Sequence, residues 1–381
     1  MSAITLNGAT SGQVTLQPPA VAGTTTLTLP TSNGTVINTA GGQTISGTTT
    51  LGTMSATNAQ VTQGLASAAY LSPFDSGYRN RIINGSMGIA QRGTSFSSPA
   101  SGSYTVDRWW LYATGTTVAS VAQVAGPTGY RYATQITGAA GNTQTALVQR
   151  IESYNCSDLS GQTITIQANI SVSSAQTINW NLQYPSAQDN WSSTTAFASG
   201  TWSATTTATT FTATITGLPS NVTNGMQLQF APQNGGAFTS GTITITGVQL
   251  ELGSVATPFE VRSVGTELAL CQRYYYNMQA QSIYALFGSG FNNSTSQASV
   301  IVNIPVPMRV TPTCSTSSVS NFYIVASGGT FSLVSINPAH YTPTTVRFDC
   351  NTSGTPLTFG MNCTLSASGT DRKSTRLNSS H

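Results

Sequence analysis

The amino-acid sequence predicts an all-β protein, and three observations carry this prediction. Charged residues make up only 6% of the 381 residues, against about 25% in an average soluble chain. Threonine, serine and glycine take their place, and threonine favours the pleated surface of a strand. Apolar residues recur with a period of two, in runs bounded by turn-forming residues, which is typical of antiparallel strands with one buried face.

The first segment, residues 1–74, is predicted to be an extended fibrous β shaft. It has no aromatic or charged residue before Tyr70, and Gly23–Leu27 recurs as Gly47–Leu51. Such a segment buries little apolar area by itself. We therefore expect parallel copies of the chain to supply the missing contacts, as in a symmetric homo-oligomer. A flexible Ser/Thr/Gly linker is the alternative interpretation.

Residues 75–262 are predicted to form a central antiparallel jelly-roll sandwich. The period of two is clearest in four runs: Ile164–Val172, Ile178–Tyr184, Phe211–Ile215 and Met226–Phe230. In the last strand the apolar phase slips at Gly247, which predicts a β-bulge there.

Residues 263–370 are predicted to form a C-terminal β-sandwich head preceded by one short helix. Thr266 is the expected N-cap of this helix, and Glu267 favours its first turn. Alternation then resumes and is most regular from Leu357 to Leu365.

The last eleven residues, 371–381, resemble the in-frame translation of a common sequencing adapter, so we expect a non-native tail. It holds three of the 13 basic and one of the ten acidic residues. Without it, ten arginines face nine acids. This near-neutral balance argues against a nucleic-acid partner.

The sequence offers no sign of a membrane or secretion segment. No apolar run reaches the length of a membrane span, and Met1 is not followed by a signal-peptide pattern. The five cysteines show no metal-binding spacing, so we expect them to be reduced and mostly buried. They are Cys156, Cys271, Cys314, Cys350 and Cys363.

The sequence also argues against an enzyme. No lysine precedes the tail, and His340 is the only histidine before it, which excludes most nucleophilic and metal-dependent sites. The acidic residues are scattered, whereas a glycosidase needs two facing carboxylates. We expect no catalytic residue, no cofactor and no metal site.

Sugar binding is the positive hypothesis. Aromatic faces with neutral Asn, Gln, Ser and Thr groups can bind a pyranose without any charge. Trp191 and Trp202 fall outside the cleanest alternations, so we expect them on exposed loops as candidate glycan contacts. Trp180 and Tyr184 share a face with core residues and are expected to be buried.

A family resemblance supports this hypothesis. The motifs that carry it are Arg81–Gly85, Gln91–Phe96, Tyr104–Trp109, Ile245–Gly253 and Thr257–Glu260. They resemble the carbohydrate-binding-module-like jelly roll of bacteriophage tail fibres and other virion appendage proteins. The resemblance implies a homotrimer that attaches a particle to its host's surface.

Charged residues cluster at the two ends of the resembling segment. Since first and last strands are often neighbours in a sandwich, we expect an arginine of the opening to pair with Glu251 or Glu260 of the closing strand. The predicted seam comprises Arg81, Arg92, Asp107, Arg108, Glu251 and Glu260.

Together these observations predict a virion tail-fibre adhesin, made in the host cytoplasm. The expected partners are two further copies of the chain, a host cell-surface polysaccharide, and tail or baseplate proteins bound through the N-terminus. No nucleic acid and no membrane insertion are expected. The alternatives are a bacterial surface carbohydrate-binding adhesin and a polysaccharide depolymerase.

Overall fold

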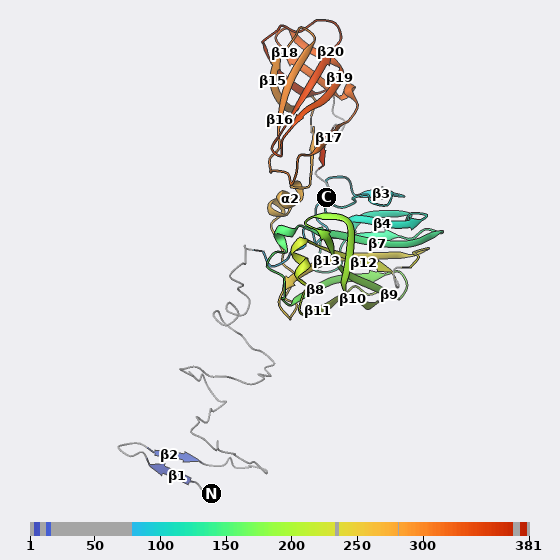
Figure 1. Ribbon diagram of the computed structural model, residues 1–381, viewed down its shortest axis with the longest axis vertical. Coiled ribbons are helices and arrows are strands. Elements are labelled where there is room, and N and C mark those ends of the chain that lie inside the picture. The colour runs from blue at the N-terminus through green and yellow to red at the C-terminus, as the bar shows by residue number, and fades with distance from the viewer. Residues whose placement is uncertain are drawn as a thin grey trace. The chain divides into compact units, whose positions relative to one another are not determined.

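The structure, a computed structural model, is all-β as predicted (Figure 1). It describes residues 4–7, 13–16, 78–232, 236–280, 282–368 and 374–378. The chain divides into two compact units, Met1–Gly64 and Leu65–His381. In the first unit, β1 (Ile4–Asn7) pairs antiparallel with β2 (Gln13–Leu16). The remainder of the predicted shaft lies outside the described residues.

The central module is an antiparallel sandwich of two sheets. The five-stranded sheet has the order β10 (Asn190–Ala204), β9 (Gln176–Ala187), β12 (Met226–Pro232), β7 (Asn142–Ile151) and β4 (Trp110–Gly115). The six-stranded sheet has the order β11 (Thr209–Ile215), β8 (Ile164–Val172), β13 (Thr242–Leu252), β6 (Tyr132–Thr137), β5 (Ser120–Ala125) and β3 (Ser95–Ser97). Two 3-10 turns, η1 (Ser153–Asn155) and η2 (Ser220–Asn224), connect strands of this module.

Alternating apolar residues fill the space between the two sheets. In β8, Ile164, Ile166 and Ile170 are fully buried, and the facing Leu182 of β9 is fully buried too. These side chains belong to one continuous core. The predicted bulge is confirmed, because the register of β13 against β8 shifts between Thr246 and Gln249.

The opening of the module lies against its last strand, as expected. The Arg81 amide donates to the Leu250 carbonyl (2.8 Å), and the Val248 amide donates to the Gly85 carbonyl (3.0 Å). A side chain at Gly85 would place its Cβ 2.1 Å from the Val248 carbonyl oxygen, so only glycine permits this approach. Backbone pairing therefore closes the sandwich.

The predicted arginine–glutamate seam is wrong. Glu251 accepts hydrogen bonds from the amide and hydroxyl of Thr257, and Glu260 accepts one from the Asn80 amide at 2.7 Å. The cation beside Glu260 is Arg262, at 3.7 Å, which comes from the closing segment itself. Thr257 thus satisfies Glu251, and the Asn80 amide and Arg262 satisfy Glu260, while the opening arginines pair elsewhere.

Two of the predicted seam arginines form other ion pairs. Arg81 contacts Asp158 at 2.6 Å, beyond the first 3-10 turn. Arg92 contacts Asp107 at 3.8 Å, so these two seam residues pair with each other within the opening segment. Asp107 is only 1% exposed, and burial raises the pKa of its carboxyl group.

Arg92 and Arg108 also contact the segment that follows the sandwich. The guanidinium carbon of Arg92 lies 3.6 Å from the ring centroid of Tyr275, and that of Arg108 lies 3.3 Å from that of Tyr274. Both tyrosines are 4% exposed. These cation–π contacts fasten the C-terminal module to the jelly roll.

One α-helix, α2 (Val264–Gln272), begins the C-terminal module. Its N-cap is Ser263, whose hydroxyl oxygen accepts from the Thr266 amide at 3.3 Å, so the predicted cap at Thr266 is wrong by three residues. Ser263 has the extended backbone that a cap requires, whereas Thr266 is already helical. Glu267 lies in the first turn as expected.

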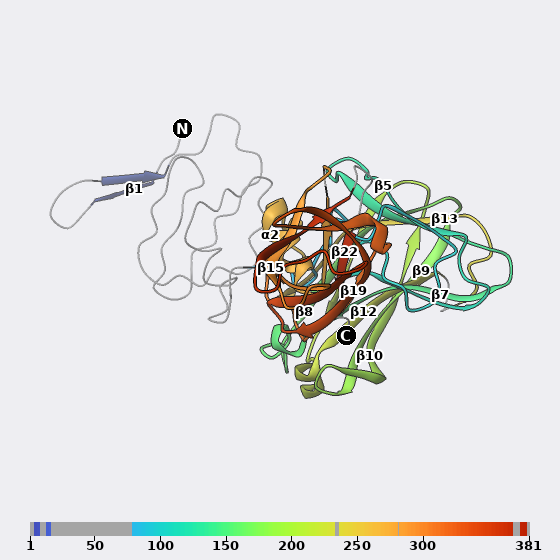
Figure 2. The ribbon, with the colours of Figure 1, turned by 90° about the horizontal axis from the view of Figure 1, so that it is seen from above.

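The C-terminal head closes as a barrel instead of remaining an open sandwich; in Figure 2 it is viewed nearly end-on. Its strands are β15 (Leu286–Asn292), β16 (Gln297–Asn303), β20 (Thr345–Thr352), β19 (Gly329–Tyr341), β18 (Phe322–Ala326) and β21 (Asn362–Ala367), with the 3-10 turn η3 (Val319–Asn321) before β18. Fully buried side chains such as Phe348 and Leu365 form its own core. Closure leaves the barrel without free strand edges.

A three-stranded sheet completes the C-terminal module. β22 (Ser374–Asn378) pairs antiparallel with both β14 (Tyr275–Gln279) and β17 (Thr313–Thr316). β22 belongs to the adapter-like tail. Its pairing relies on main-chain groups, which any non-proline sequence can supply.

The cysteines are as expected from the sequence. All five are free, and four of them are buried, Cys314 being half-buried. Burial raises the pKa of the Cys314 thiol to about 12 and that of Cys363 to about 11. The thiols are therefore protonated at neutral pH and unreactive.

Candidate glycan-binding face

The outer face of the five-stranded sheet is the candidate functional site. Cross-strand partners share a face, and Val148 of β7 lies opposite both Trp110 of β4 and Gln229 of β12. The face continues through Asn181 of β9 to Ser199 of β10. We define the outer face as Trp110, Tyr112, Gln144, Ala146, Val148, Arg150, Asn179, Asn181, Gln183, Trp191, Ser199, Thr201, Gln227, Gln229 and Ala231.

Small side chains make the middle of this face concave. Ala146, Val148 and Ala231 form a small apolar cluster beside Trp110. Next to it lies a hollow of about 360 Å³, lined mainly by neutral amides and hydroxyls. Its polar lining residues are Gln144, Asn179, Asn181, Ser199, Thr201 and Gln229. Such a surface can hydrogen-bond the hydroxyl groups of a sugar.

One acceptor in this hollow is not satisfied. Among the described residues, Oδ1 of Asn181 has no hydrogen-bond partner, although it is shielded from solvent. A buried polar atom without a partner carries a free-energy cost. A hydroxyl group bound in the hollow would remove that cost.

Aromatic side chains lie on the same face as the hollow. Tyr112 is 36% exposed and packs edge-on against Trp110, with ring centroids 6.4 Å apart. Trp191, at the start of β10, is half-buried. Flat aromatic faces of this kind can stack on the apolar face of a pyranose.

A chain of hydrogen bonds fixes the polar groups beside the aromatics. Arg150 Nε donates to Gln227 (3.0 Å), and Gln227 Nε2 donates to Gln183 (3.2 Å). The Thr194 hydroxyl donates to the same Gln183 oxygen at 2.6 Å. The chain spans four strands, so these side chains are ordered before any ligand binds.

The two predicted glycan contacts have different environments. Trp191 lies on the outer face, in strand β10 and not on a loop. Trp202 is 7% exposed and packs between Phe211 and Phe230, with centroids 5.7 and 5.9 Å away. The expectation of an exposed Trp202 is therefore wrong, because this indole fills the core.

Sequence reasoning missed Trp110, Tyr112 and Arg150. Of the adjacent Trp109 and Trp110, only Trp109 is buried in the core. The signal was the alternation of Trp110 and Tyr112 with Leu111, which places the two aromatics on the opposite face from the core.

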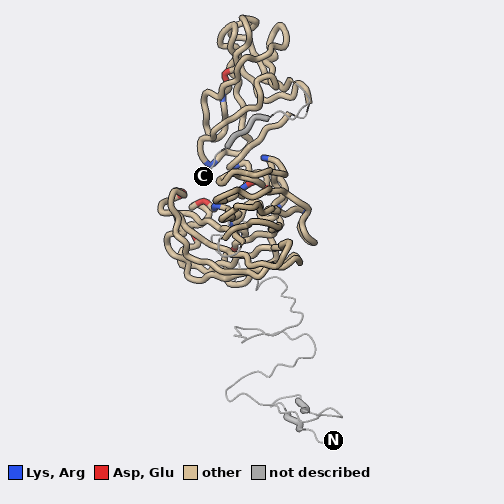
Figure 3. Tube along the Cα trace, turned by 90° about the vertical axis from the view of Figure 1, so that its right-hand side faces the viewer, with Lys and Arg blue, Asp and Glu red and all other residues tan. Residues whose placement is uncertain are grey.

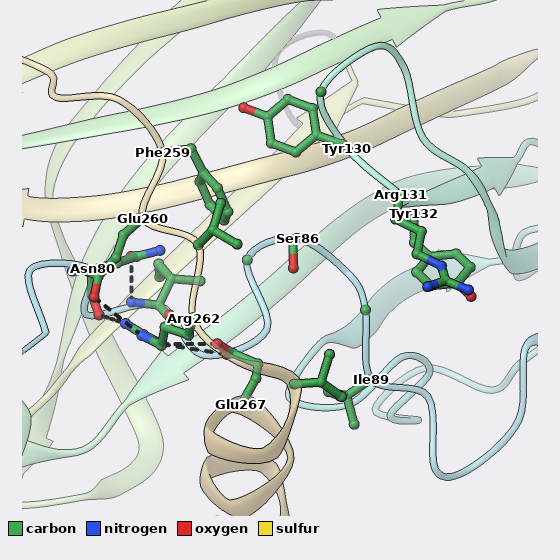
Figure 4. A pocket seen from close by; sticks show the side chains of 16 residues that line it. Asn80, Ser86, Ile89, Tyr130, Arg131, Tyr132, Phe259, Glu260, Arg262 and Glu267 are labelled. Carbon is green, nitrogen blue, oxygen red and sulfur yellow. Dashed lines mark hydrogen bonds and ion pairs between the residues drawn. The ribbon is translucent and has the colours of Figure 1, made fainter.

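A second cavity, of about 500 Å³, lies beside α2 (Figure 4). Tyr130 and Phe259 form its aromatic wall, with ring centroids 5.5 Å apart. Arg262 donates to the Ile82 carbonyl (3.1 Å) and pairs with Glu267 (3.4 Å). These contacts tie the opening segment to α2, so the charged groups of this cavity serve the fold.

The described part of the chain offers neither a metal-binding cluster nor a membrane-spanning helix. No group of three His, Cys, Asp or Glu side chains there is arranged to hold a metal ion. No described helix is both long and apolar enough to cross a membrane.

Comparison with known proteins finds similar structures only. No family model and no curated protein matches the chain. A structure of CBM4 is 20% identical, with a TM-score of 0.31, over 45% of this chain and 99% of the other. The enzymatically active domain of bacteriophage CBA120 tailspike protein 4 is 16% identical, with a TM-score of 0.33, over 48% of this chain and 22% of that one.

A third similar structure is TmCBM61 in complex with beta-1,4-galactotriose. It is 12% identical, with a TM-score of 0.30, over 46% of this chain and 100% of that chain. At this level of similarity, each ligand or activity is a property of the protein that carries it.

Proposed function

We propose that this chain is a non-enzymatic receptor-binding protein that attaches a virion to glycans on the host surface through the outer face. The single observation behind this proposal is that one face of the sheet carries both the amide-lined hollow and the aromatic side chains Trp110, Tyr112 and Trp191. Aromatic stacking and amide hydrogen bonds are the two contacts that sugars offer a protein.

The assignment to a virion rests on the sequence. The motifs at both ends of the jelly roll resemble those of tail-fibre proteins, and residues 1–74 have the composition of a fibre shaft. In this proposal three chains form a trimer anchored through its N-terminal end. Three weak sites on one rigid particle would bind a repetitive glycan far more tightly than one site, through effective concentration.

Binding without cleavage is favoured by the charges of the outer face. None of the residues that define it is a carboxylate, whereas glycoside hydrolysis needs two carboxyl groups on either side of the bond. Incubation of the protein with a bound polysaccharide should release no oligosaccharide. Release of fragments would favour a depolymerase instead.

The binding test uses single aromatic substitutions and a glycan array. Trp191→Ala should weaken binding by roughly thirtyfold, the effect of about 2 kcal/mol expected for an aromatic anchor. Phe359→Ala is the matched control, because Phe359 is 71% exposed and lies in the barrel module. Equal binding by the two variants would exclude the outer face as the site.

A further inference from the structure

Arg150 is the only charged residue among those that define the outer face, and it lies near the end of β7, between Trp110 and Trp191. Its guanidinium carbon lies 4.8 Å from the Trp110 ring centroid and 5.1 Å from that of Trp191. Its Nε donates to Gln227. The guanidinium is thus held in one orientation by two indoles and one amide.

No anion in the described part of the chain neutralises this guanidinium. Nη1 and Nη2 of Arg150 donate no hydrogen bond there, and no carboxylate forms an ion pair with Arg150. A second cation, Arg108, lies close by, and its Nη2 donates to the Arg150 carbonyl. Burial, followed by the repulsion from Arg108, lowers the pKa of Arg150 despite a favourable contribution from Tyr104.

This arrangement differs from that of three other partly buried arginines. Arg81, Arg262 and Arg273 each have a carboxylate within 3.4 Å. Figure 3 shows how sparse charged positions are along the described chain, so few carboxylates are available to neutralise a cation. A cation partly removed from water gains from an anionic partner.

We propose that the outer face selects glycans that carry a carboxylate, and that Nη1 and Nη2 of Arg150 bind this group. The inference rests on the proposed function and names its ligand class. A planar carboxylate matches two N–H groups of a guanidinium in a bidentate pair. One cation matches one acidic sugar, whose neighbours would stack on Trp110 and Trp191 and bond the amides.

The test uses acidic oligosaccharides and their carboxyl-reduced derivatives, which differ only at the carboxylate. The full chain should bind the acidic member of at least one pair about tenfold more tightly, the size of one charge-assisted contact. Arg150→Gln should reduce this ratio to about one, and the ratio of the two affinities, unlike either affinity alone, does not change when binding of both sugars weakens together. Arg150→Lys should restore part of the preference, because lysine retains the positive charge but lacks the paired N–H groups of a guanidinium.

Controls separate a local effect from a loss of folding. Arg131→Gln removes an exposed arginine that lies over the ring of Tyr132. Arg131 immediately precedes β6 of the six-stranded sheet, so this variant should retain the full acid preference. Melting temperatures of all variants should agree with that of the unmodified protein. If the melting temperature falls in Arg150→Gln but not in Arg150→Lys, the acid preference measured for the lysine variant decides whether Arg150 binds the carboxylate.

The possible outcomes separate a failure of the carboxylate assignment from a failure of the proposed glycan binding. Equal binding of acidic and reduced sugars, or a preference for sulfated over carboxylated ones, would overturn the carboxylate assignment and leave glycan binding intact. An acid preference that survives Arg150→Gln would overturn it too. Binding to no glycan at all would overturn both proposals.

Discussion

Trp191 and Trp202 lie in the same strand, β10, yet they lie in opposite environments. Trp202 stacks at 5.7 Å on Phe211 in the core, and Trp191 lies over Arg150 on the outer face. Eleven positions separate them, and two register shifts intervene, one between Asn190 and Thr194 and one between Ala196 and Ala198. Because bulges change which face the following residues take, the face of neither residue can be read from alternation alone.

Trp202→Ala should destabilise the protein by about 3–5 kcal/mol, because it empties a large core volume. Trp191→Ala should cost much less, since its indole is half-buried. Chemical denaturation of the two variants measures the difference. A larger loss for Trp191→Ala would contradict the assignment of Trp202 to the core.

Asp107 should make stability depend on pH. Burial raises the pKa of its carboxyl group above the ordinary value of 3.8, so the folded state binds the proton more tightly than the unfolded state does. The free energy of unfolding should therefore fall as pH rises from 3.8 through the folded-state pKa. Denaturation midpoints of the unmodified protein and Asp107→Asn, compared across this range, isolate the effect. A gap between them that stays constant with pH would contradict it.

At the scale of the element, period-two alternation located the strands of the sandwich well, but in the regular run from Leu357 to Leu365 the strand β21 begins only at Asn362. The runs from 164, 178, 211 and 226 became β8, β9, β11 and β12. The bulge was also predictable, because a phase slip beside a glycine is a local signal. Alternation could not reveal that the C-terminal strands close into a barrel, since closure depends on which distant edges pair.

Gly247→Ala tests the bulge. Gly247 has φ +59, and an added Cβ would lie 2.5 Å from the ring of Tyr130. Gly217→Ala is the matched control, with φ +61 and no atom within 4 Å. We expect the free energy of unfolding to fall by about 1 kcal/mol in the control, the cost of positive φ alone. In Gly247→Ala it should fall by a further ~1–3 kcal/mol because of overpacking. Equal losses in thermal denaturation would show that Tyr130 moves aside without cost.

At the scale of the whole molecule, the shaft argument predicts a trimer. Size-exclusion chromatography with light scattering should give three times the chain mass. Removal of residues 1–74 should weaken association, because that segment is expected to obtain its burial from neighbouring copies. A monomer with an ordered shaft would contradict the prediction.

The sequence by itself determined the all-β class, the antiparallel sandwich followed by a helix and further strands, and the meeting of the opening with the last strand. These follow from short-range periodicity and composition, which a single chain displays directly. Only the tertiary structure decided which cation faces Glu260, where Trp202 lies, and that Trp110, Arg150 and Trp191 meet. Those residues come from β4, β7 and β10, and pairing between distant strands creates the face they share. Long-range register is set by packing of the whole core, so no local pattern records it.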